Sequence, residues 1–312
     1  MTAAYVPREL TGGITDEELY DAAWENNKAV LVTGPTGAGK SMSVLSWASK
    51  NSLPVAHVNL GFDMGPGELF GDWYPDGDGG FVWRDGAVTK LLRGGNGVVF
   101  FDELNRAKPS VTATLHPLLD DRREIVLYRH NGEVVSPSGK ILVVAAVNPE
   151  GDYVGALPLD PAVRRRFAYQ VRWDYDDDVE SQLVSSAELL KLARAIRKGF
   201  GTKLSTRTPV STADLVELEE AVSTVGAAAA WGLFLSRFGD EDRGVVEEMV
   251  EMHRRAIEAQ WADSLGTGGV SFKGRDESPR GDGVEKKTEA GSPRRARAAN
   301  KTVGSRRRGT LL

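Results

Sequence analysis

The apolar residues of this chain fall into short unbroken runs, separated by longer segments in which apolar residues recur with helical spacing. An unbroken apolar run predicts a strand buried on both faces, and such strands pair in parallel when helices alternate with them. The pattern therefore predicts an α/β fold with a mostly parallel sheet covered by helices on both faces. The predicted strands are Ala29–Thr33, Leu53–Leu60, Gly97–Glu103, Lys140–Asn148 and Ala168–Trp173.

Helices are predicted between and after these strands. Thr15-Asp-Glu-Glu18 is typical of a capping box and predicts a helix that runs to about Asn26. After the last strand only helices are predicted, which indicates a small helical domain. The further helices predicted before that point are Ser41–Lys50, Gly86–Arg93, Pro109–Asp120 and a short one from Pro161. Those predicted after it are Val179–Lys198, Ser211–Ser223, Gly226–Phe238 and Glu241–Trp261.

Two segments interrupt the alternation of strands and helices. Gly61–Asp85 is rich in glycine and aromatic residues and is predicted to be a long loop, and long loops commonly carry function. Its aromatic side chains could equally pack over neighbouring helices. Farther along, Asn131-Gly132 lies between the strand-like runs Glu124–Arg129 and Glu133–Ser136, which predicts a β-hairpin.

A glycine-rich turn follows the first predicted strand, and its spacing is the Walker A pattern. In that pattern backbone N–H groups surround the phosphates of a nucleotide, and the lysine adds a positive charge. The helix predicted after the turn presents its positive end to the same anion. The predicted nucleotide-binding residues are Gly34, Pro35, Thr36, Gly37, Ala38, Gly39, Lys40 and Ser41.

Two adjacent acids end a later apolar strand. Side chains in this position face the crevice in which open α/β sheets bind ligands. We expect Asp102 to hold Mg²⁺ together with Ser41, and Glu103 to orient and deprotonate an attacking water. At the end of the next buried strand, Asn148 could either open a turn before Pro149 or reach the γ-phosphate side of the crevice.

Composition narrows the possible functions. Of 312 residues, 41% are hydrophobic and 27% charged, which is ordinary for a globular protein. The chain has no cysteine, which excludes disulfides, cysteine-bound zinc and thiol catalysis, and its four histidines lack metal-ligand spacing. No window contains the roughly 18 apolar residues of a membrane span, and no leader pattern opens the chain, so we expect a cytoplasmic protein without a membrane partner.

Charge divides the chain into two parts. Residues 264–312 hold 12 Lys/Arg and 5 Asp/Glu, a net charge of +7, whereas the whole chain carries −5, which leaves −12 for the rest. The basic part is rich in Gly, Ser, Pro and Arg and lacks apolar periodicity, which predicts a disordered tail. A tail of this charge could bind nucleic acid, but the acidic remainder argues against DNA threading.

These motifs together resemble the AAA+ ATPases, in particular the MoxR branch with its CbbQ and GvpN relatives. The resemblance covers about residues 15–240 and stops before the tail. Besides the two nucleotide motifs, the sequence segments that show the resemblance are Asp85-Gly-Ala-Val-Thr-Lys90, Phe101-Asp-Glu-Leu-Asn-Arg-Ala107, Ala146-Val-Asn-Pro149, Leu159-Asp-Pro-Ala162, Arg165-Arg-Phe167 and Ser205-Thr-Arg207.

The resemblance implies a P-loop core with a five-stranded parallel sheet, followed by a helical lid. Together with the composition of the chain, it divides the sequence into a core at residues 1–173, a lid at 174–263 and the tail at 264–312. Within the core, residues 61–85 correspond to the helix-2 insert and residues 124–136 to the pre-sensor hairpin, and in the family both face a central pore. The resemblance also implies a homo-oligomeric ring, expected to be a hexamer, with ATP bound between subunits.

The resemblance also gives roles to several polar residues. Asn148 corresponds to sensor 1, and Arg207 to sensor 2, which contacts the γ-phosphate from the lid. Arg165 and Arg166 match the arginine-finger region, through which one subunit reaches its neighbour's nucleotide. Because Arg164 precedes them directly, the sequence leaves open which arginine is the finger.

The expected function is ATP hydrolysis with Mg²⁺ in a ring that remodels or activates a client protein. One alternative is a nucleic-acid-associated motor or nuclease-linked NTPase whose basic tail binds DNA or RNA. Another is a nucleotide-gated scaffold in which assembly matters more than turnover. The sequence does not identify the client.

Overall fold

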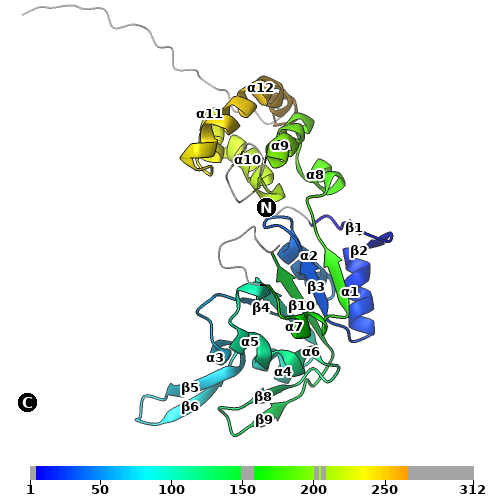
Figure 1. Cartoon of the computed structure of the whole chain (residues 1–312), viewed down its shortest axis with the longest axis vertical. Helices are drawn as coiled ribbons and strands as arrows, with labels where there is room; N and C mark the ends of the chain where they lie inside the picture. Colours follow the sequence, from blue (N-terminus) through cyan, green and yellow to red (C-terminus); the bar gives the residue numbers. More distant parts are fainter. Residues whose placement is uncertain (1–4, 149–157, 200–203, 205–208, 266–312) are drawn as a thin grey trace, which may run out of the picture. The chain divides into compact units, whose positions relative to one another are not determined.

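A five-stranded parallel sheet lies at the centre of the fold in the computed structural model, which describes residues 5–148, 158–199, 204 and 209–265. The strand order is β11-β3-β10-β7-β4. Figure 1 labels β3, β10 and β4 of this sheet. The α/β fold class and all five predicted strands are therefore confirmed. The strands are β3 (Val30–Thr33), β4 (Val55–Asn59), β7 (Gly97–Asp102), β10 (Ile141–Val147) and β11 (Tyr169–Arg172).

Both faces of this sheet are apolar, because neighbouring residues of a strand point to opposite faces and here both kinds are hydrophobic. On β7, Val98 and Phe100 belong to one buried cluster, whereas Val99 and Phe101 belong to another. Two helices, α1 (Asp16–Glu25) and α2 (Lys40–Lys50), supply residues to the first cluster. The unbroken apolar runs in the sequence thus reflect a sheet that is covered on each side.

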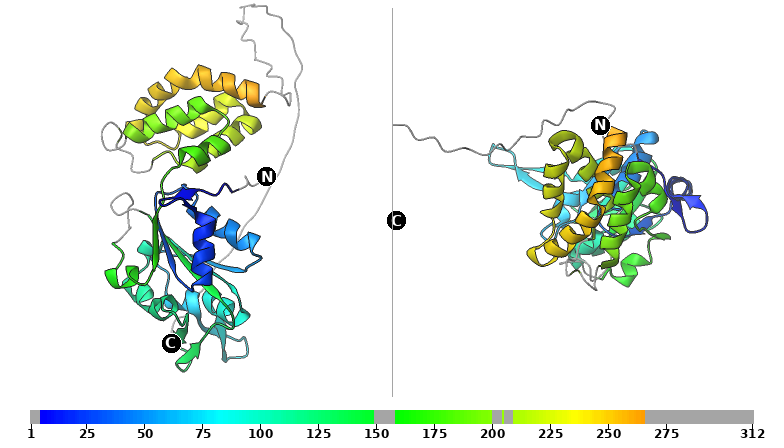
Figure 2. Two further views of the ribbon diagram at one scale, coloured as in Figure 1. Left: turned by 90° about the vertical axis from the view of Figure 1, so that its right-hand side faces the viewer. Right: turned by 90° about the horizontal axis from the view of Figure 1, so that it is seen from above.

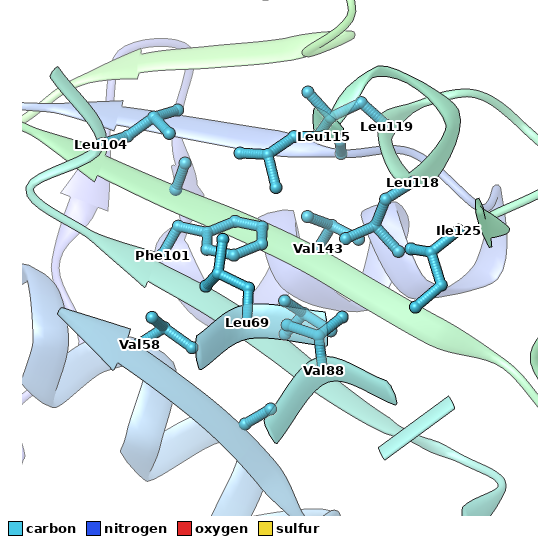
Figure 3. Close-up of a cluster of buried hydrophobic side chains, with 14 of the residues drawn as sticks. Val58, Leu69, Val88, Phe101, Leu104, Leu115, Leu118, Leu119, Ile125 and Val143 are labelled. Atoms are coloured by element: carbon cyan, nitrogen blue, oxygen red, sulfur yellow. The ribbon is translucent and has the colours of Figure 1, made fainter. Parts of the chain in front are cut away.

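The second face is covered by short helices. Leu69, Leu115 and Leu118 from these segments meet Phe101 and Val143 of the sheet (Figure 3). The covering helices are α3 (Pro66–Phe70), α4 (Ala87–Gly94), α5 (Pro109–Thr114), α6 (His116–Leu119) and α7 (Pro161–Arg164), with a 3₁₀ turn at Leu104–Arg106.

The helix predicted at Pro109–Asp120 is divided into α5 and α6. Pro117 lies at the start of α6, and proline has no N–H to donate to the carbonyl four residues earlier. The capping box at Thr15, in contrast, has the predicted geometry: its hydroxyl accepts from the Glu18 N–H, and the Glu18 carboxylate accepts from the Thr15 N–H. The chain reaches this cap through a two-stranded sheet, β1 (Glu9–Leu10) and β2 (Ile14–Thr15).

The expectation of a long loop at Gly61–Asp85 is wrong, because the segment contains α3 and a hairpin of β5 (Gly71–Pro75) and β6 (Phe81–Asp85). The turn of this hairpin closes on Asp76, whose carboxylate accepts from the N–H groups of Asp78 and Gly80. Four aromatic residues of this segment, Trp73, Tyr74, Phe81 and Trp83, lie on the paired strands.

The hairpin predicted around Asn131-Gly132 is present as β8 (Ile125–Leu127) and β9 (Glu133–Val135). Asn131 and Gly132 have φ values of 55° and 68°, the left-handed region that Asn-Gly adopts readily. This hairpin contacts the β5–β6 hairpin through stacked rings. The His130 ring centroid is 4.6 Å from that of Trp83 and 5.5 Å from that of Trp73.

The residues after Asp176 form helices around a separate hydrophobic cluster (Figure 2). The predicted helix Val179–Lys198 is divided into two. The division falls at Ser185 and Ser186, whose backbone N–H groups both donate to the Glu219 carboxylate of a later helix instead of to carbonyls within one helix. The helices are α8 (Asp177–Leu183), α9 (Ala187–Gly199), α10 (Thr212–Val225), α11 (Ala227–Leu235) and α12 (Asp240–Leu265).

None of the helices in the described ranges is long and apolar enough to cross a membrane. Apart from its first two residues, at the end of α12, the predicted tail 264–312 lies outside the described residues.

Candidate active site

The glycine-rich turn joins β3 to α2, and three of its glycines occupy positions that exclude a side chain. Gly37 and Gly39 have φ values of 72° and 89°, which L-residues with a side chain rarely adopt. Gly34 approaches β11 so closely that an added Cβ would lie 2.5 Å from the Trp173 carbonyl oxygen. The Walker A glycines are therefore required by the shape of the turn and by its closeness to the end of β11.

Lys40 is the first residue of α2 and is 7% exposed. Its Nζ donates to the carbonyls of Gly34 and Pro35, at 2.8 and 2.7 Å, and to Asn148 Oδ1 at 3.1 Å. The lysine thus lies across the turn that precedes it and joins the ends of β3 and β10. A polyphosphate on the turn would give this ammonium group the anionic partner that carbonyls do not supply.

Burial lowers the pKa of Lys40 to about 8, because an ammonium group away from water loses hydration. The negative charges of Asp102 and Glu103 oppose this shift without cancelling it. The lysine is therefore partly neutral in mildly alkaline solution until an anion binds beside it.

Ser41 and Asp102 meet at the ends of α2 and β7. The Ser41 hydroxyl donates to Asp102 Oδ2 at 2.6 Å, and His57 Nε2 lies 3.7 Å from the same oxygen. Mg²⁺ binds through one or two protein oxygens and completes its shell with water and phosphate oxygens. The hydroxyl and carboxylate provide this donor set, so the residues fit the predicted metal.

Glu103 has a left-handed backbone, with φ 55° and ψ 40°. Such a conformation costs on the order of 1–2 kcal/mol in a residue with a side chain. Its Oε2 accepts from Arg106 Nη1 at 2.9 Å, and its Oε1 lies 3.5 Å from Asn148 Nδ2. The strained backbone therefore presents the carboxylate to Asn148 and Arg106.

Asn105 supports Asn148 from behind. It is 5% exposed, and its Nδ2 donates to the Asn148 carbonyl at 3.0 Å. Asn148 in turn is 6% exposed and reaches both Lys40 and Glu103 with its amide group. Its side chain therefore lies beside the phosphate loop, whereas the alternative interpretation, a turn before Pro149, lies outside the described residues.

Comparison with known proteins places these features in a family. Residues 29–167 match the family model described as "AAA domain (dynein-related subfamily)". "Denitrification regulatory protein NirQ" of Stutzerimonas stutzeri is 33% identical over 194 residues, which cover 59% of this chain and 68% of that protein. "Protein NorQ" of Paracoccus denitrificans is 31% identical over 245 residues, or 75% of this chain and 83% of that protein. NirQ and NorQ are MoxR-family AAA+ ATPases.

This chain belongs to the MoxR branch of the AAA+ ATPases. The NirQ of Pseudomonas aeruginosa is 36% identical over 159 residues, and the match spans 51% of this chain and 59% of that protein. Among solved structures, a protein of Cytophaga hutchinsonii aligns with 82% of this chain and 89% of its own, at 18% identity and a TM-score of 0.43.

Membership of the AAA+ ATPases implies nucleotide binding, and a cavity of about 820 Å³ adjoins the phosphate loop of this MoxR-branch chain. The cavity is large enough for a base and sugar, and its lining is mainly apolar apart from a few polar groups. Lining residues come from the N-terminal segment, the loop and the helical region, and include Val6, Ala38, Met42, Val179, Leu183 and Val216.

The arginine predictions have different outcomes. Arg164 and Arg165 are exposed, and no described residue forms an ion pair with either. Arg166 Nε lies 3.3 Å from Asp120 Oδ1 of the same chain. Arg207 lies outside the described residues. In this MoxR-branch chain the structure therefore brings together Lys40, Ser41, Asp102, Glu103 and Asn148, and it does not bring Arg166 to them.

Sequence reasoning gave no role to four side chains at this site: Asn105, Arg106, His57 and Arg8. Arg106 could have been found by its spacing, because it lies three residues after Glu103 on the same turn. His57 gave no signal beyond its place near the end of a predicted strand. Arg8 precedes every motif, and only the tertiary structure brings its side chain to the loop.

Proposed function

We propose that this MoxR-branch protein hydrolyses ATP with Mg²⁺ on the loop Gly34–Ser41. The observation that carries the proposal is a set of three contacts: Lys40 to Asn148 at 3.1 Å, Asn148 to Glu103 at 3.5 Å, and Ser41 to Asp102 at 2.6 Å. These residues come from two strand ends, those of β7 and β10, and from the start of α2, and each has the chemistry that nucleotide hydrolysis needs.

Lys40 and the loop N–H groups bind the phosphates in this proposal, and the adjoining cavity accepts the base and sugar. Ser41 and Asp102 would hold Mg²⁺, which when bound neutralises charge on the phosphate oxygens. Glu103 orients a water and accepts its proton, and Asn148 keeps that water in line with the γ-phosphate. Asn148 can do so because it already lies between the carboxylate and the lysine.

The arginine finger is assigned to Arg165 in this proposal, because the family's finger region matches Arg165 and Arg166 and does not include the equally exposed Arg164. A finger must extend from its own subunit into the site of a neighbour. Arg165 is exposed, and no described residue pairs with it, whereas Arg166 is held by Asp120. Arg207 is proposed as the lid residue that contacts the γ-phosphate, on the strength of its family position alone.

We further propose a homo-oligomeric ring in the cytoplasm, a hexamer, that remodels or activates a client protein. The family supports this, as do the relatives NirQ, which is named a regulatory protein, and NorQ. The exposed aromatic residues of the β5–β6 hairpin, among them Phe81 and Tyr74, offer an apolar surface for such a partner.

The decisive experiment is phosphate release by the full chain and by Glu103→Gln. We expect the variant to lose about a hundredfold or more in turnover while it still binds ATP, because only the proton acceptor is removed. Glu17→Gln is the matched control, since Glu17 pairs with Lys50 on the surface of the molecule. A Glu103→Gln protein with normal turnover would rule out the proposed base.

The same variant addresses the partner. Under ATP, Glu103→Gln should retain its client, so crosslinking followed by mass spectrometry is expected to recover one protein that wild type with ADP does not retain.

The nucleic-acid alternative rests on the basic tail. DNA or RNA that stimulates hydrolysis in the full chain, but not in a chain without residues 270–312, would favour a nucleic-acid motor over a client-activating ATPase.

A further inference from the structure

Arg8 lies in the segment before α1 and is fastened to the core by a buried carboxylate. Its backbone N–H donates to Asp16 Oδ1 at 3.0 Å, and its carbonyl accepts from the Asp16 N–H at 3.1 Å. The Tyr5 hydroxyl donates to the other oxygen of Asp16, which is fully buried. Tyr5 and Arg8 are therefore both held against the start of α1.

The Arg8 guanidinium bridges two carbonyls that are far apart in sequence. Nη2 donates to Ala38 of the phosphate loop at 2.8 Å, and Nη1 donates to Asp174 at 2.6 Å. The same group lies over the Trp173 ring, 4.8 Å from its centroid, and the Trp173 indole N–H also donates to Ala38, at 2.9 Å. The Ala38 carbonyl of the loop thus accepts from both the Arg8 guanidinium and the Trp173 indole N–H at the end of β11.

The Ala38 and Asp174 carbonyls belong to two different parts of the chain, the phosphate loop and the connection to the helical lid. Ala38 precedes the start of α2, where the nucleotide phosphates would bind. Asp174 opens the hinge, which we define as residues 174–176 between β11 and α8. Asp176 ends the hinge and caps α8, accepting from the N–H groups of Asp178 and Val179. A shift at Asp174 would therefore be passed on to the first helix of the lid.

The charge of Arg8 has no anionic partner among the described residues. The side chain is 5% exposed, no described carboxylate forms an ion pair with it, and its Nε has no hydrogen-bond partner there. Guanidinium groups stay charged, and buried charges are normally paired. An anion on the adjoining loop would compensate this charge.

We propose that Arg8 is a positioning residue that couples the nucleotide on the phosphate loop to the hinge of the lid. The inference rests on the proposed nucleotide-binding function and adds a residue outside the motifs that define it. A polyphosphate that orders the loop moves the Ala38 carbonyl, and the rigid guanidinium transmits that movement to Asp174. The positive charge also favours the anion-bound form of the loop.

Arg123 is the matched control, because it is buried in a similar way without touching the loop. It is 3% exposed, and its guanidinium donates to the carbonyls of Leu118, Leu119 and Asn27. If Arg8 served only to fasten the chain, removing either arginine would have the same kind of effect.

The experiment compares wild type, Arg8→Ala, Arg8→Lys and Arg123→Ala in the full chain. ADP affinity is measured by calorimetry, and hydrogen exchange across residues 174–183 is measured with and without ADP. Arg8→Ala should bind ADP about tenfold to a hundredfold more weakly and lose the ADP-induced protection of the hinge. Arg8→Lys should regain most of the affinity through its charge but not the hinge response, since an ammonium group cannot bridge both carbonyls as a planar fork does.

Arg123→Ala should lower the melting temperature, yet keep ADP affinity within about twofold of wild type and keep the hinge response. The inference is overturned if Arg8→Ala and Arg8→Lys match wild type, or if Arg123→Ala weakens ADP binding and hinge protection as much as Arg8→Ala does. If wild type bound neither ADP nor ATP, the proposed nucleotide-binding function would be contradicted together with the inference. If wild type and Arg8→Ala both bound ADP normally, only the inference about Arg8 would be contradicted.

Discussion

The phosphate site and the paired hairpins lie on the same core and depart from ordinary packing in opposite ways. At the phosphate site, polar groups are buried: Lys40 and Asn148 are 7% and 6% exposed. On the hairpins, apolar groups are exposed: Phe81 and Tyr128 are 67% and 77% exposed. Burying charge costs stability, and exposing large apolar side chains invites association, which is why we propose nucleotide binding at the first region and partner binding at the second.

The two regions also differ in what holds them. The site is held by short contacts between buried polar groups, and its backbone is strained at Glu103. The hairpins are joined by stacked rings and by the Trp73 indole N–H, which donates to the Arg129 carbonyl at 2.8 Å. We therefore expect changes at the hairpins to alter stability without altering nucleotide binding, and changes at the site to alter nucleotide binding first.

The largest expected effect on the hairpins comes from Trp83→Ala. Trp83 packs against Trp73 and His130 and against the core cluster, so its loss should cost about 2–3 kcal/mol in the free energy of unfolding, measured by urea denaturation. Nucleotide affinity should stay within about twofold. Phe81→Ala on the same hairpin is the control and should cost less than about 0.5 kcal/mol, because that ring is exposed. A large loss of nucleotide affinity in Trp83→Ala would contradict the expectation that the hairpins affect stability and not nucleotide binding.

At the site, the lowered pKa of Lys40 predicts a pH dependence of nucleotide binding. Polyphosphate favours the charged ammonium, whereas the nucleotide-free chain loses this proton above a pKa of about 8. Binding above pH 8 should therefore take up a proton, and ADP affinity in EDTA should fall about eightfold from pH 7.5 to pH 9. Calorimetry in two buffers of different ionisation enthalpy measures the proton uptake directly, and its absence at pH 9 would contradict the low pKa.

The stability of the nucleotide-free fold changes with pH in the opposite direction to nucleotide affinity. The unfolded chain keeps the lysine proton to higher pH than the folded chain, so the contribution of Lys40 to stability rises as pH increases from about 8 to about 10.4. Alkaline conditions should therefore weaken nucleotide binding while this one group makes the nucleotide-free fold more stable.

The smallest expected effect is that of Arg129→Ala. Its guanidinium pairs with Asp72 across the two hairpins, but the arginine side chain is 69% exposed, and exposed pairs contribute little. Its loss should cost less than about 1 kcal/mol by urea denaturation, and 1 M salt should remove most of the difference from wild type. A cost near that of Trp83→Ala would mean that charge, rather than ring stacking, joins the hairpins.

Strands and the phosphate loop could be predicted because their signals are local. The inner strands β3, β7 and β10 are unbroken apolar runs, and the edge strands β4 and β11 alternate between more and less buried residues. The left-handed turns at Gly37 and Gly39 need glycine whatever surrounds them. The hairpin at Asn131-Gly132 was predictable for the same reason. The β5–β6 hairpin was missed because its glycines and aromatic residues resemble those of a loop until Trp73 and Trp83 are seen to pair across strands.

The sequence by itself determined the α/β alternation, the Walker A turn and the adjacent acids, since these depend on side-chain type and spacing within a few residues. Only the tertiary structure placed Ser41 at 2.6 Å from Asp102 and let Arg8 bridge Ala38 and Asp174. Contacts between residues 61 or 166 positions apart depend on how the strands are ordered in the sheet, and no local pattern records that order.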